Sequence, residues 1–162
     1  MDVTETMLPG VGLRYEFVTG SGHRVGIVAQ RGGRFEIAAY SIGQDDASPM
    51  RQRLVRAFDR FVDLKAAAPE QVAARIRDDG IDLLVDLKGH TAGAPPRILA
   101  LRPAPLQAHY LGYPGTIGGG LVDYLIGDAV VTPTAHAADY AETLVRLPGS
   151  YQVNDRDRPV VE

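Results

Sequence analysis

The chain has 162 residues, of which 45% are hydrophobic, and this is enough apolar material for one domain with a core of its own. Its formal net charge of −3 at pH 7 leaves no basic surface to neutralise phosphates, which argues against a nucleic-acid-binding protein. The absence of cysteine excludes disulfides, thiolate metal sites and thiol nucleophiles.

Neither a metal site nor a membrane segment is expected from the sequence. The histidines lack the spacing of metal ligands; they are His23, His90, His109 and His136. No apolar stretch is long enough to span a membrane, and the N-terminus lacks the basic and apolar segments of a signal peptide. We therefore expect a cytoplasmic protein.

The N-terminal part alternates apolar and polar residues in the manner of β-strands. Leu13, Tyr15 and Phe17 fall on one face of a strand, and the segments "GSG" (20–22) and "GG" (32–33) interrupt the pattern. With "RFEIAAY" following the second interruption, the pattern predicts a three-stranded β-meander with tight glycine turns. We assign residues 1–34 to this meander, 35–155 to the domain that follows and 156–162 to a polar tail.

After residue 41 the pattern changes to helices that alternate with short buried strands. Ser48 followed by Pro49 predicts the start of a helix over about 49–60, with Phe61 or Val62 continuing its apolar face and its arginines on a solvated face. A second helix is expected from Pro69 to Gly80.

The second half of the chain predicts a parallel sheet. The continuous apolar character of "IDLLVDL" (81–87) is typical of a strand covered on both faces. Further strands are expected at 106–112, 123–131 and 145–151, and short helices at 95–101 and 134–144. Helices alternating with buried strands predict an α/β protein with a three-layer arrangement.

Two loops with many glycines and prolines follow strands of this expected sheet, "KGHTAGAPP" (88–96) and "GYPGTIGGG" (112–120). Ligands of such sheets bind beyond the carboxyl ends of the strands, and glycine allows the backbone to approach a ligand closely. Neither loop matches a phosphate-binding loop or a dinucleotide-binding turn. On the residues alone, ordinary turns remain the alternative to a binding site.

Titratable residues at the strand ends are further candidates. His90 lies in a loop at the end of a strand, whereas His109 lies within an apolar strand and is expected to be a hydrogen-bonded core imidazole. Aspartates at strand ends and turns can act as acid or base, or can cap backbone groups. They are Asp82, Asp86, Asp123 and Asp128.

A family resemblance covers the chain from about Arg34 to Asp155. It is carried by "RFEIAAYSIGQDD", by "IRDDGIDLLVDLKGHTAGAPPRILALRPAPLQAHYLGYPGTIGGGLVDYLIGDAVVTP" and by "YAETLVRLPGSYQVND". The combination of "ALRPAP", "LGYPGT" and "DY" in this order resembles the catalytic region of glycosyltransferase family 41, the O-linked N-acetylglucosamine transferases and SPINDLY proteins.

The resemblance implies a fold and a site. Family members have two Rossmann-like lobes in the GT-B arrangement, with the active site between them, and the matched segment resembles the N-terminal lobe. A nucleotide sugar such as UDP-N-acetylglucosamine would be a substrate, and no cofactor is implied. The sugar-binding cleft would be lined by Leu111, Gly112, Tyr113, Pro114, Gly115 and Thr116, and the acceptor side by Gly89, His90 and Thr91.

The chain departs from the family pattern in two places. The family begins this lobe with a strand of the "LRIGYVSGDF" kind, a loop carrying an aspartate and a His-Pro pair, and a helix. Here His23 is followed by Arg24, and residues 24–34 are too few for that loop and a crossover helix before Phe35. Because the loop with the family's catalytic candidates is not matched, no catalytic residue is assigned. The second lobe, which supplies most contacts to the nucleotide sugar, has no counterpart either.

Residues 1–34 resemble a different family. Their "LPGVGLRYEFVTGSGHRVGIV" and "RGGR" are similar to the N-terminal segment of TrkA-C-type regulatory subunits of potassium and proton antiporters. No ion-binding residue can be transferred from this resemblance. It implies that the chain is a composite.

Two functions are therefore expected from the sequence. The first is a partial protein O-glycosyltransferase that transfers N-acetylglucosamine or fucose to Ser or Thr and is inactive as an isolated chain. The alternative is a non-enzymatic binding, regulatory or structural module. The expected partners are a polypeptide acceptor or a chain carrying the missing lobe, and an exposed cleft wall would favour self-association.

Overall fold

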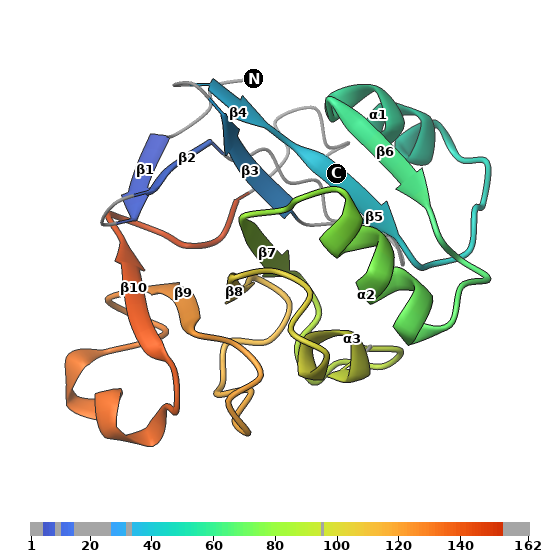
Figure 1. Cartoon of the computed structure of the whole chain (residues 1–162). Helices are drawn as coiled ribbons and strands as arrows, with labels where there is room; N and C mark the ends of the chain where they lie inside the picture. Colours follow the sequence, from blue (N-terminus) through green and yellow to red (C-terminus); the bar gives the residue numbers. More distant parts are fainter. Residues whose placement is uncertain (1–4, 9–10, 15–26, 32–33, 95, 154–162) are drawn as a thin grey trace.

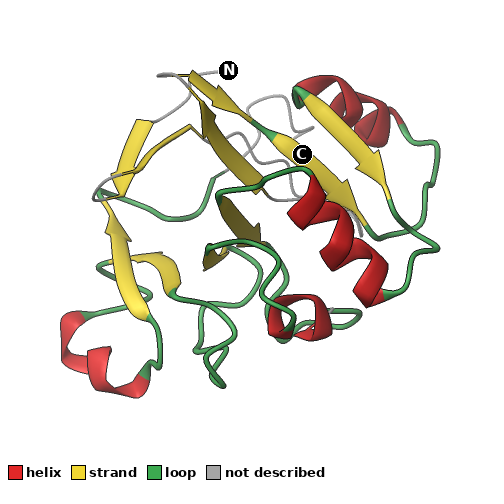
Figure 2. Ribbon diagram, viewed as in Figure 1, coloured by secondary structure: helices red, strands yellow, loops and turns green. Residues whose placement is uncertain are grey.

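The computed structural model describes residues 5–8, 11–14, 27–31, 34–94 and 96–153 (Figures 1 and 2). Its helices are α1 (Pro49–Ala57), α2 (Pro69–Asp78) and α3 (Pro96–Ala100), with a 3-10 helix at Thr134–Asp139. Its strands are β1 (Glu5–Leu8), β2 (Val11–Arg14), β3 (Ile27–Arg31), β4 (Arg34–Glu36), β5 (Ala38–Ser41), β6 (Arg60–Asp63), β7 (Leu83–Asp86), β8 (Leu106–Tyr110), β9 (Tyr124–Asp128) and β10 (Thr143–Leu147).

The largest sheet has the strand order β10-β9-β8-β7-β3-β4. Strands β7 to β10 are parallel, with Leu83 opposite Leu106 and Ala108 opposite Tyr124. Strand β3 runs antiparallel to β7, with Ile27 opposite Leu84, and β4 runs antiparallel to β3. Strands β5 and β6 form a separate parallel pair, and β1 and β2 an antiparallel pair.

Helices α2 and α3 pack on one face of the large sheet. One core cluster joins α2 and α3 to one face of the sheet, through residues such as Val72, Ile76, Ile98 and Leu84. The alternate residues of β7, including Leu83 and Val85, belong to a second cluster on the other face. Helix α2 lies in front of the strands in Figure 2.

Helix α1 lies on the opposite face of the β5–β6 pair from α2. Tyr40 belongs to the cluster with α2, whereas its neighbour Ser41 accepts a hydrogen bond from Arg51 of α1. The Arg51 guanidinium also lies 4.5 Å from the centre of the Phe61 ring and bonds Asp63. Because α1 and α2 lie on opposite faces of the β5–β6 pair, the expected α/β, Rossmann-like three-layer arrangement is confirmed.

The first helix was predicted too long. Ser48 caps it by accepting a hydrogen bond from the Arg51 N–H, but it ends at Ala57, and Phe58 has an extended backbone. Phe61 and Val62 lie on β6 instead of continuing the helix, because pairing with β5 overrides their helical spacing. The prediction of a solvated face is wrong for Arg51, which is 4% exposed. Its guanidinium pairs with Asp63 on the inner side of α1.

The second helix and the short third helix are confirmed. Helix α2 buries Val72, Ala73 and Ile76, and the chain leaves it through Gly80 at φ +66°. The predicted helix at 134–144 is wrong: only a 3-10 helix forms there. Thr143 and Leu144 already pair with β9 as part of β10, which ends before the predicted strand boundary at 151.

The N-terminal prediction is tested only in part. Strands β3 and β4 form the expected antiparallel hairpin, and β3 joins the large sheet beside β7. The strand expected over "RFEIAAY" ends at Glu36, and the residues that follow form β5, which pairs with β6 in a separate sheet. The expected strand around Tyr15 and Phe17 and the turn at 20–22 lie outside the described residues, as does the tail at 156–162. The division at residue 34 remains a prediction.

Asp79 lies at the centre of a polar cluster at the end of α2, and a pH-dependent stability follows from it. Its carboxylate accepts hydrogen bonds from Tyr40 (2.6 Å) and Arg75 (2.9 Å) and pairs with Arg60 (2.9 Å). Burial alone would raise the pKa of Asp79, but the bonds from Tyr40 and Arg75 and the nearby Arg60 charge outweigh burial and lower it.

We expect Asp79→Asn to weaken the acid dependence of unfolding. Because the folded-state pKa of Asp79 lies below its unfolded value, the carboxylate stabilises the fold fully above about pH 4, and this is lost as the pH falls further. Urea denaturation of both proteins at pH 7 and pH 3 measures the difference. If the unfolding free energy falls equally in both proteins between pH 7 and pH 3, Asp79 is not the source of the acid dependence.

Candidate functional site

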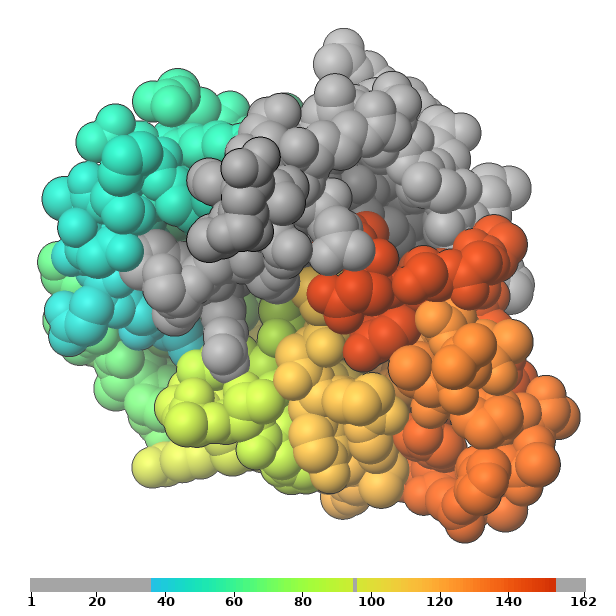
Figure 3. Space-filling view, turned by 180° about the vertical axis from the view of Figure 1, so that it is seen from behind, coloured from blue at the N-terminus to red at the C-terminus, as the bar shows by residue number. Residues whose placement is uncertain are grey.

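Two loops leave the carboxyl edge of the parallel strands and contact each other. We call residues 87–93 the β7 loop and residues 111–120 the β8 loop. Because β7 and β8 are parallel neighbours, the two loops start from the same edge of the sheet. Figure 3 shows the corresponding yellow-green and gold segments adjoining on the surface.

The expected acceptor-side residues lie in the β7 loop, against the β8 loop. Gly89 has φ +55°, and a side chain there would overlap the ring of His109 and the side chain of Tyr113. The Nε2 atom of His90 lies 2.9 Å from the Ile117 carbonyl oxygen, and its ring meets the Tyr113 ring edge-on at 5.5 Å. The Thr91 hydroxyl donates to the Lys88 carbonyl within the loop.

The expected sugar-cleft residues form the first half of the β8 loop. Leu111 turns the chain at φ +71°, and Gly112 packs so closely on the β7 loop that a Cβ would lie 2.1 Å from the Leu87 carbonyl oxygen. A Cβ on Gly115 would overlap the Tyr113 ring, while Tyr113 itself is 36% exposed. The Pro114 carbonyl accepts a hydrogen bond from the Tyr140 hydroxyl. The structure therefore brings both sets of residues into one surface.

Glu142 holds the second half of the β8 loop and was missed by sequence reasoning. It is 7% exposed, accepts from the backbone N–H of Ile117 (2.8 Å) and Gly118 (2.9 Å), and accepts from the Thr116 hydroxyl (2.8 Å). The sequence carries no signal for these contacts, because Glu142 lies far along the chain, just before β10.

A hydrogen-bonded pair of Asp86 and His109 lies beneath both loops. His109 is 1% exposed, as expected for a core imidazole. Its Nδ1 lies 3.0 Å from the Asp86 carboxylate and its Nε2 lies 2.5 Å from the Tyr113 carbonyl oxygen. Asp86 also accepts from the N–H groups of Lys88 (3.1 Å) and Gly89 (2.6 Å).

The charge state of Asp86 follows from these bonds. Burial alone would raise the pKa of its carboxyl, but the hydrogen bonds from His109 and from the Gly89 N–H outweigh burial and hold the pKa below its usual value. Asp86 is therefore a carboxylate in the folded protein.

Two of the other candidate aspartates hold the chain in place. Asp128 accepts hydrogen bonds from the backbone of Val130, Val131 and Tyr151, and those from Tyr151 and Val131 lower its pKa most. Asp123 pairs with Arg102 and accepts from the Gln107 N–H. The capping interpretation is confirmed for both.

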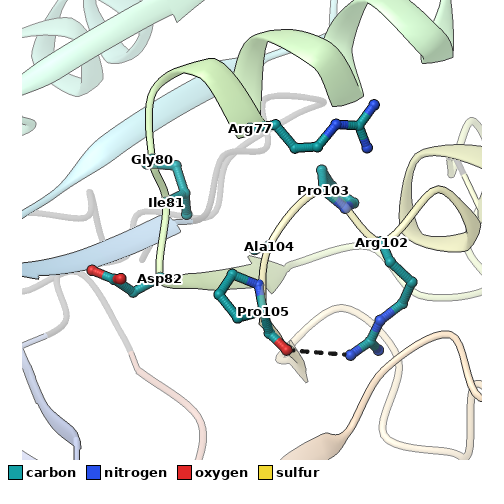
Figure 4. A pocket seen from close by; sticks show the side chains of 8 residues that line it. All are labelled: Arg77, Gly80, Ile81, Asp82, Arg102, Pro103, Ala104 and Pro105. Atoms are coloured by element: carbon teal, nitrogen blue, oxygen red, sulfur yellow. Dashed lines mark hydrogen bonds between the residues drawn. The ribbon is translucent and has the colours of Figure 1, made fainter.

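A cavity of about 660 Å³ lies at the opposite edge of the sheet (Figure 4). It is formed by the segments before β7 and β8, including Asp82 and residues 102–105, together with Arg77. Both arginines are already bonded, Arg77 to the Leu101 carbonyl and Arg102 to Asp123. The "RPAP" motif thus has a structural role here, at the edge away from the two loops.

The arrangement suits binding by shape more than acid–base chemistry. The polar side chains of His90 and Thr91 bond backbone carbonyls and that of Thr116 bonds Glu142, while the exposed Tyr113 ring offers a flat apolar face. In the described part of the chain, no three histidine, aspartate or glutamate side chains are grouped so as to hold a metal ion. None of the helices described is long and apolar enough to cross a membrane.

Comparison with known proteins agrees with the sequence resemblance. The model of the family "Glycosyl transferase family 41" matches residues 25–160. A probable UDP-N-acetylglucosamine–peptide N-acetylglucosaminyltransferase SEC of Arabidopsis thaliana is 40% identical over 120 residues, which cover 74% of this chain and 12% of that protein. A UDP-N-acetylglucosamine–peptide N-acetylglucosaminyltransferase of Caenorhabditis elegans is 37% identical over 123 residues, which cover 75% of this chain and 11% of that protein.

A solved structure is similar as well. The K341M mutant of the Thermobaculum terrenum O-GlcNAc transferase superposes with a TM-score of 0.68 at 34% identity, over 72% of this chain and 22% of that one. The chain thus spans about an eighth of the curated relatives' length and under a quarter of that structure's chain. The match over residues 25–160 covers most of the sequence, and the chain accordingly belongs to glycosyl transferase family 41.

Proposed function

We propose that this chain forms the sugar-facing and acceptor-facing part of a protein O-N-acetylglucosaminyltransferase. The observation that carries the proposal is the contact between the β7 and β8 loops, which places Gly89–Thr91 and Leu111–Thr116 in one surface at the carboxyl edge of the sheet. The activities for which the relatives are named support N-acetylglucosamine as the sugar and a peptide as the acceptor.

In the proposed reaction the sugar is held in place while an acceptor hydroxyl replaces the nucleoside diphosphate on it. The oxygen of an acceptor Ser or Thr forms a bond to the anomeric carbon, and the bond from that carbon to the diphosphate oxygen breaks. The hydroxyl proton passes to a base or to solvent, and the nucleoside diphosphate leaves. The β8 loop would position the sugar and the β7 loop would border the acceptor, with no metal or organic cofactor.

We further propose that the isolated chain transfers no sugar. The contacts of the described loops are internal, and nothing in the resemblance assigns residues of this chain to the departing diphosphate. Stabilising that developing charge is usually a large part of the catalytic effect. The remaining contacts would come from a second lobe, in the same polypeptide or in a partner chain.

Titration of the ¹⁵N-labelled chain with UDP-N-acetylglucosamine tests the proposed site. We expect weak binding, with a dissociation constant on the order of 1 mM, because only the sugar side is contacted. Backbone amide shifts should concentrate at residues 89–91 and 111–116, with smaller changes for UDP alone, and no product should form with a peptide acceptor.

The controls separate the alternatives. GDP-fucose, added in the same way, reports whether the loops prefer the other candidate sugar. The variant His136→Gln, on the exposed 3-10 helix, should leave the shifts unchanged. Shifts around Arg102, or none at a concentration of several millimolar, would favour the non-enzymatic module.

Self-association through the loop surface is part of the same proposal. Tyr113 is 36% exposed, and Val130, which follows β9 at the same edge of the sheet, is 82% exposed. Exposed apolar groups of this kind favour contacts between copies. Light scattering over a wide concentration range measures the oligomeric state. A monomer at every concentration contradicts self-association.

A further inference from the structure

Ala141 and Glu142, which directly precede β10, bond the second half of the β8 loop. The Ala141 N–H donates to the Thr116 hydroxyl oxygen (3.2 Å), and the Glu142 side chain reaches the backbone that follows Thr116. Figure 3 shows the gold segment that contains the loop beside the orange segment that contains these two residues. Because β10 pairs with β9 from its first residue onward, the contacts tie the loop to the sheet.

The two oxygens of the Glu142 side chain have separate partners. Oε1 accepts from the Ile117 N–H (2.8 Å) and from the Gly118 N–H (2.9 Å), and Oε2 accepts from the Thr116 hydroxyl (2.8 Å). Gly118 has φ +69°, a left-handed conformation that glycine adopts without strain. Turns in which successive N–H groups converge on one point bind anions. We call residues 116–118 the nest.

The nest accounts for the burial of Glu142, which is 7% exposed. Among the residues that the structure describes, no lysine, arginine or histidine nitrogen lies within ion-pair distance of its carboxyl group. A carboxyl group that leaves water needs hydrogen bonds in exchange. The nest supplies them, and two of its donors are backbone N–H groups, which keep their hydrogens at any pH.

We propose that residues 116–118 form a carboxylate-binding site and that Glu142 is its built-in ligand. The class of ligand follows from the contacts, because one oxygen meets two N–H groups while the second oxygen on the same carbon meets a hydroxyl. A free carboxylate such as acetate has the same pair of oxygens. It occupies the nest when the Glu142 side chain is absent.

The nest adjoins the residues assigned to the sugar, since Thr116 belongs to both sets. Glu142 is thereby a positioning residue for the sugar-facing half of the β8 loop, and this consequence rests on the function proposed above. Carboxylate binding by the nest is a property of the free chain and needs no nucleotide sugar.

Glu142→Ala empties the nest, and acetate is the probe that refills it. Without the carboxyl group, the amides of Ile117 and Gly118 should exchange with solvent about tenfold faster than in the unmodified chain. Replacing sodium chloride by sodium acetate at constant ionic strength and neutral pH should reverse this change and then saturate. Acetate at about ten times its dissociation constant shifts the equilibrium about tenfold toward the protected loop.

The unmodified chain and Glu142→Gln are the matched controls. The nest of the unmodified chain is filled, so acetate should leave the exchange at 117 and 118 unchanged. The glutamine oxygen can still accept from both N–H groups, so this variant should gain little protection from acetate. A general effect of acetate on protein stability would appear equally in the controls and in Glu142→Ala.

A measurement on the unmodified chain keeps the test decisive should Glu142→Ala not fold. NMR couplings across hydrogen bonds should join the amide nitrogens of Ile117 and Gly118 to the side-chain carboxyl carbon of Glu142. Their absence overturns the proposal whatever the variant does.

Two outcomes with the folded variant overturn it as well: acetate protects Glu142→Ala no better than chloride does, or it protects the unmodified chain to the same degree. Addition of UDP-N-acetylglucosamine then distinguishes this site from the proposed function. Protection by acetate without sugar binding to the unmodified chain rejects the transferase function alone. Sugar binding to the unmodified chain without protection of the variant by acetate rejects the carboxylate site alone.

Discussion

Gly112→Ala is expected to lower the free energy of unfolding by about 3 kcal/mol and to abolish nucleotide-sugar binding. The added methyl group would lie 2.1 Å from the Leu87 carbonyl oxygen and 2.9 Å from its carbon. These are backbone atoms of the β7 loop, so no side-chain rotation can relieve the overlap. The two loops must separate, and the surface that they form together is lost.

Gly118→Ala is the matched control within the same loop. Gly118 has φ +69°, but an added Cβ would meet no atom within 4 Å. Gly118→Ala should lower the free energy of unfolding only by the backbone strain of an alanine in this conformation, about 1 kcal/mol. Urea denaturation measures both variants, and equal costs would show that the contact between the loops is not the source of the effect at Gly112.

Glu142→Ala is expected to cost a similar amount, about 3 kcal/mol, for a different reason. The Glu142 carboxylate accepts from the Ile117 and Gly118 N–H groups and from the Thr116 hydroxyl. Removing it leaves the buried Ile117 N–H without a partner, and the partly buried Gly118 N–H as well. Such donors cost more than the lost bonds contribute. Amide exchange at 116–118 should rise together with the loss of stability.

Glu142→Gln separates the hydrogen bonds from the charge. The glutamine oxygen can still accept from the Ile117 and Gly118 N–H groups, and its NH₂ group can donate to the Thr116 hydroxyl. We expect a loss of about 1 kcal/mol by thermal or urea denaturation. A glutamine variant as unstable as the alanine variant would mean that the negative charge itself holds the loop.

The elements of the parallel sheet could be predicted because their signals are local. Pro69 and Gly80 mark the two ends of α2, and the apolar run at 81–87 contains β7. The two loops could be located as well, because glycine and proline follow each strand. Phe61 and Val62 show the limit: their spacing fits a helix, and only pairing with β5 makes them a strand.

The contacts that organise the site could not be predicted, because they join residues far apart in the sequence. Glu142 meets Thr116, and Asp86 meets His109, only when the strands take their order in the sheet. A carboxylate before β10 has the same local pattern whether it faces solvent or a loop. The family resemblance assigned the loop residues but none of these supporting side chains.

The place of β3 beside β7 in the sheet has a consequence for how this chain folds. Strands β7 to β10 follow one another in the sequence, whereas β3 pairs with β7 across α1, α2 and the β5–β6 pair. Closing so long a loop costs chain entropy before the pairing gives anything in return. The parallel strands can therefore assemble first, and the docking of β3, which adds β3 and β4 to the sheet, becomes the slow step.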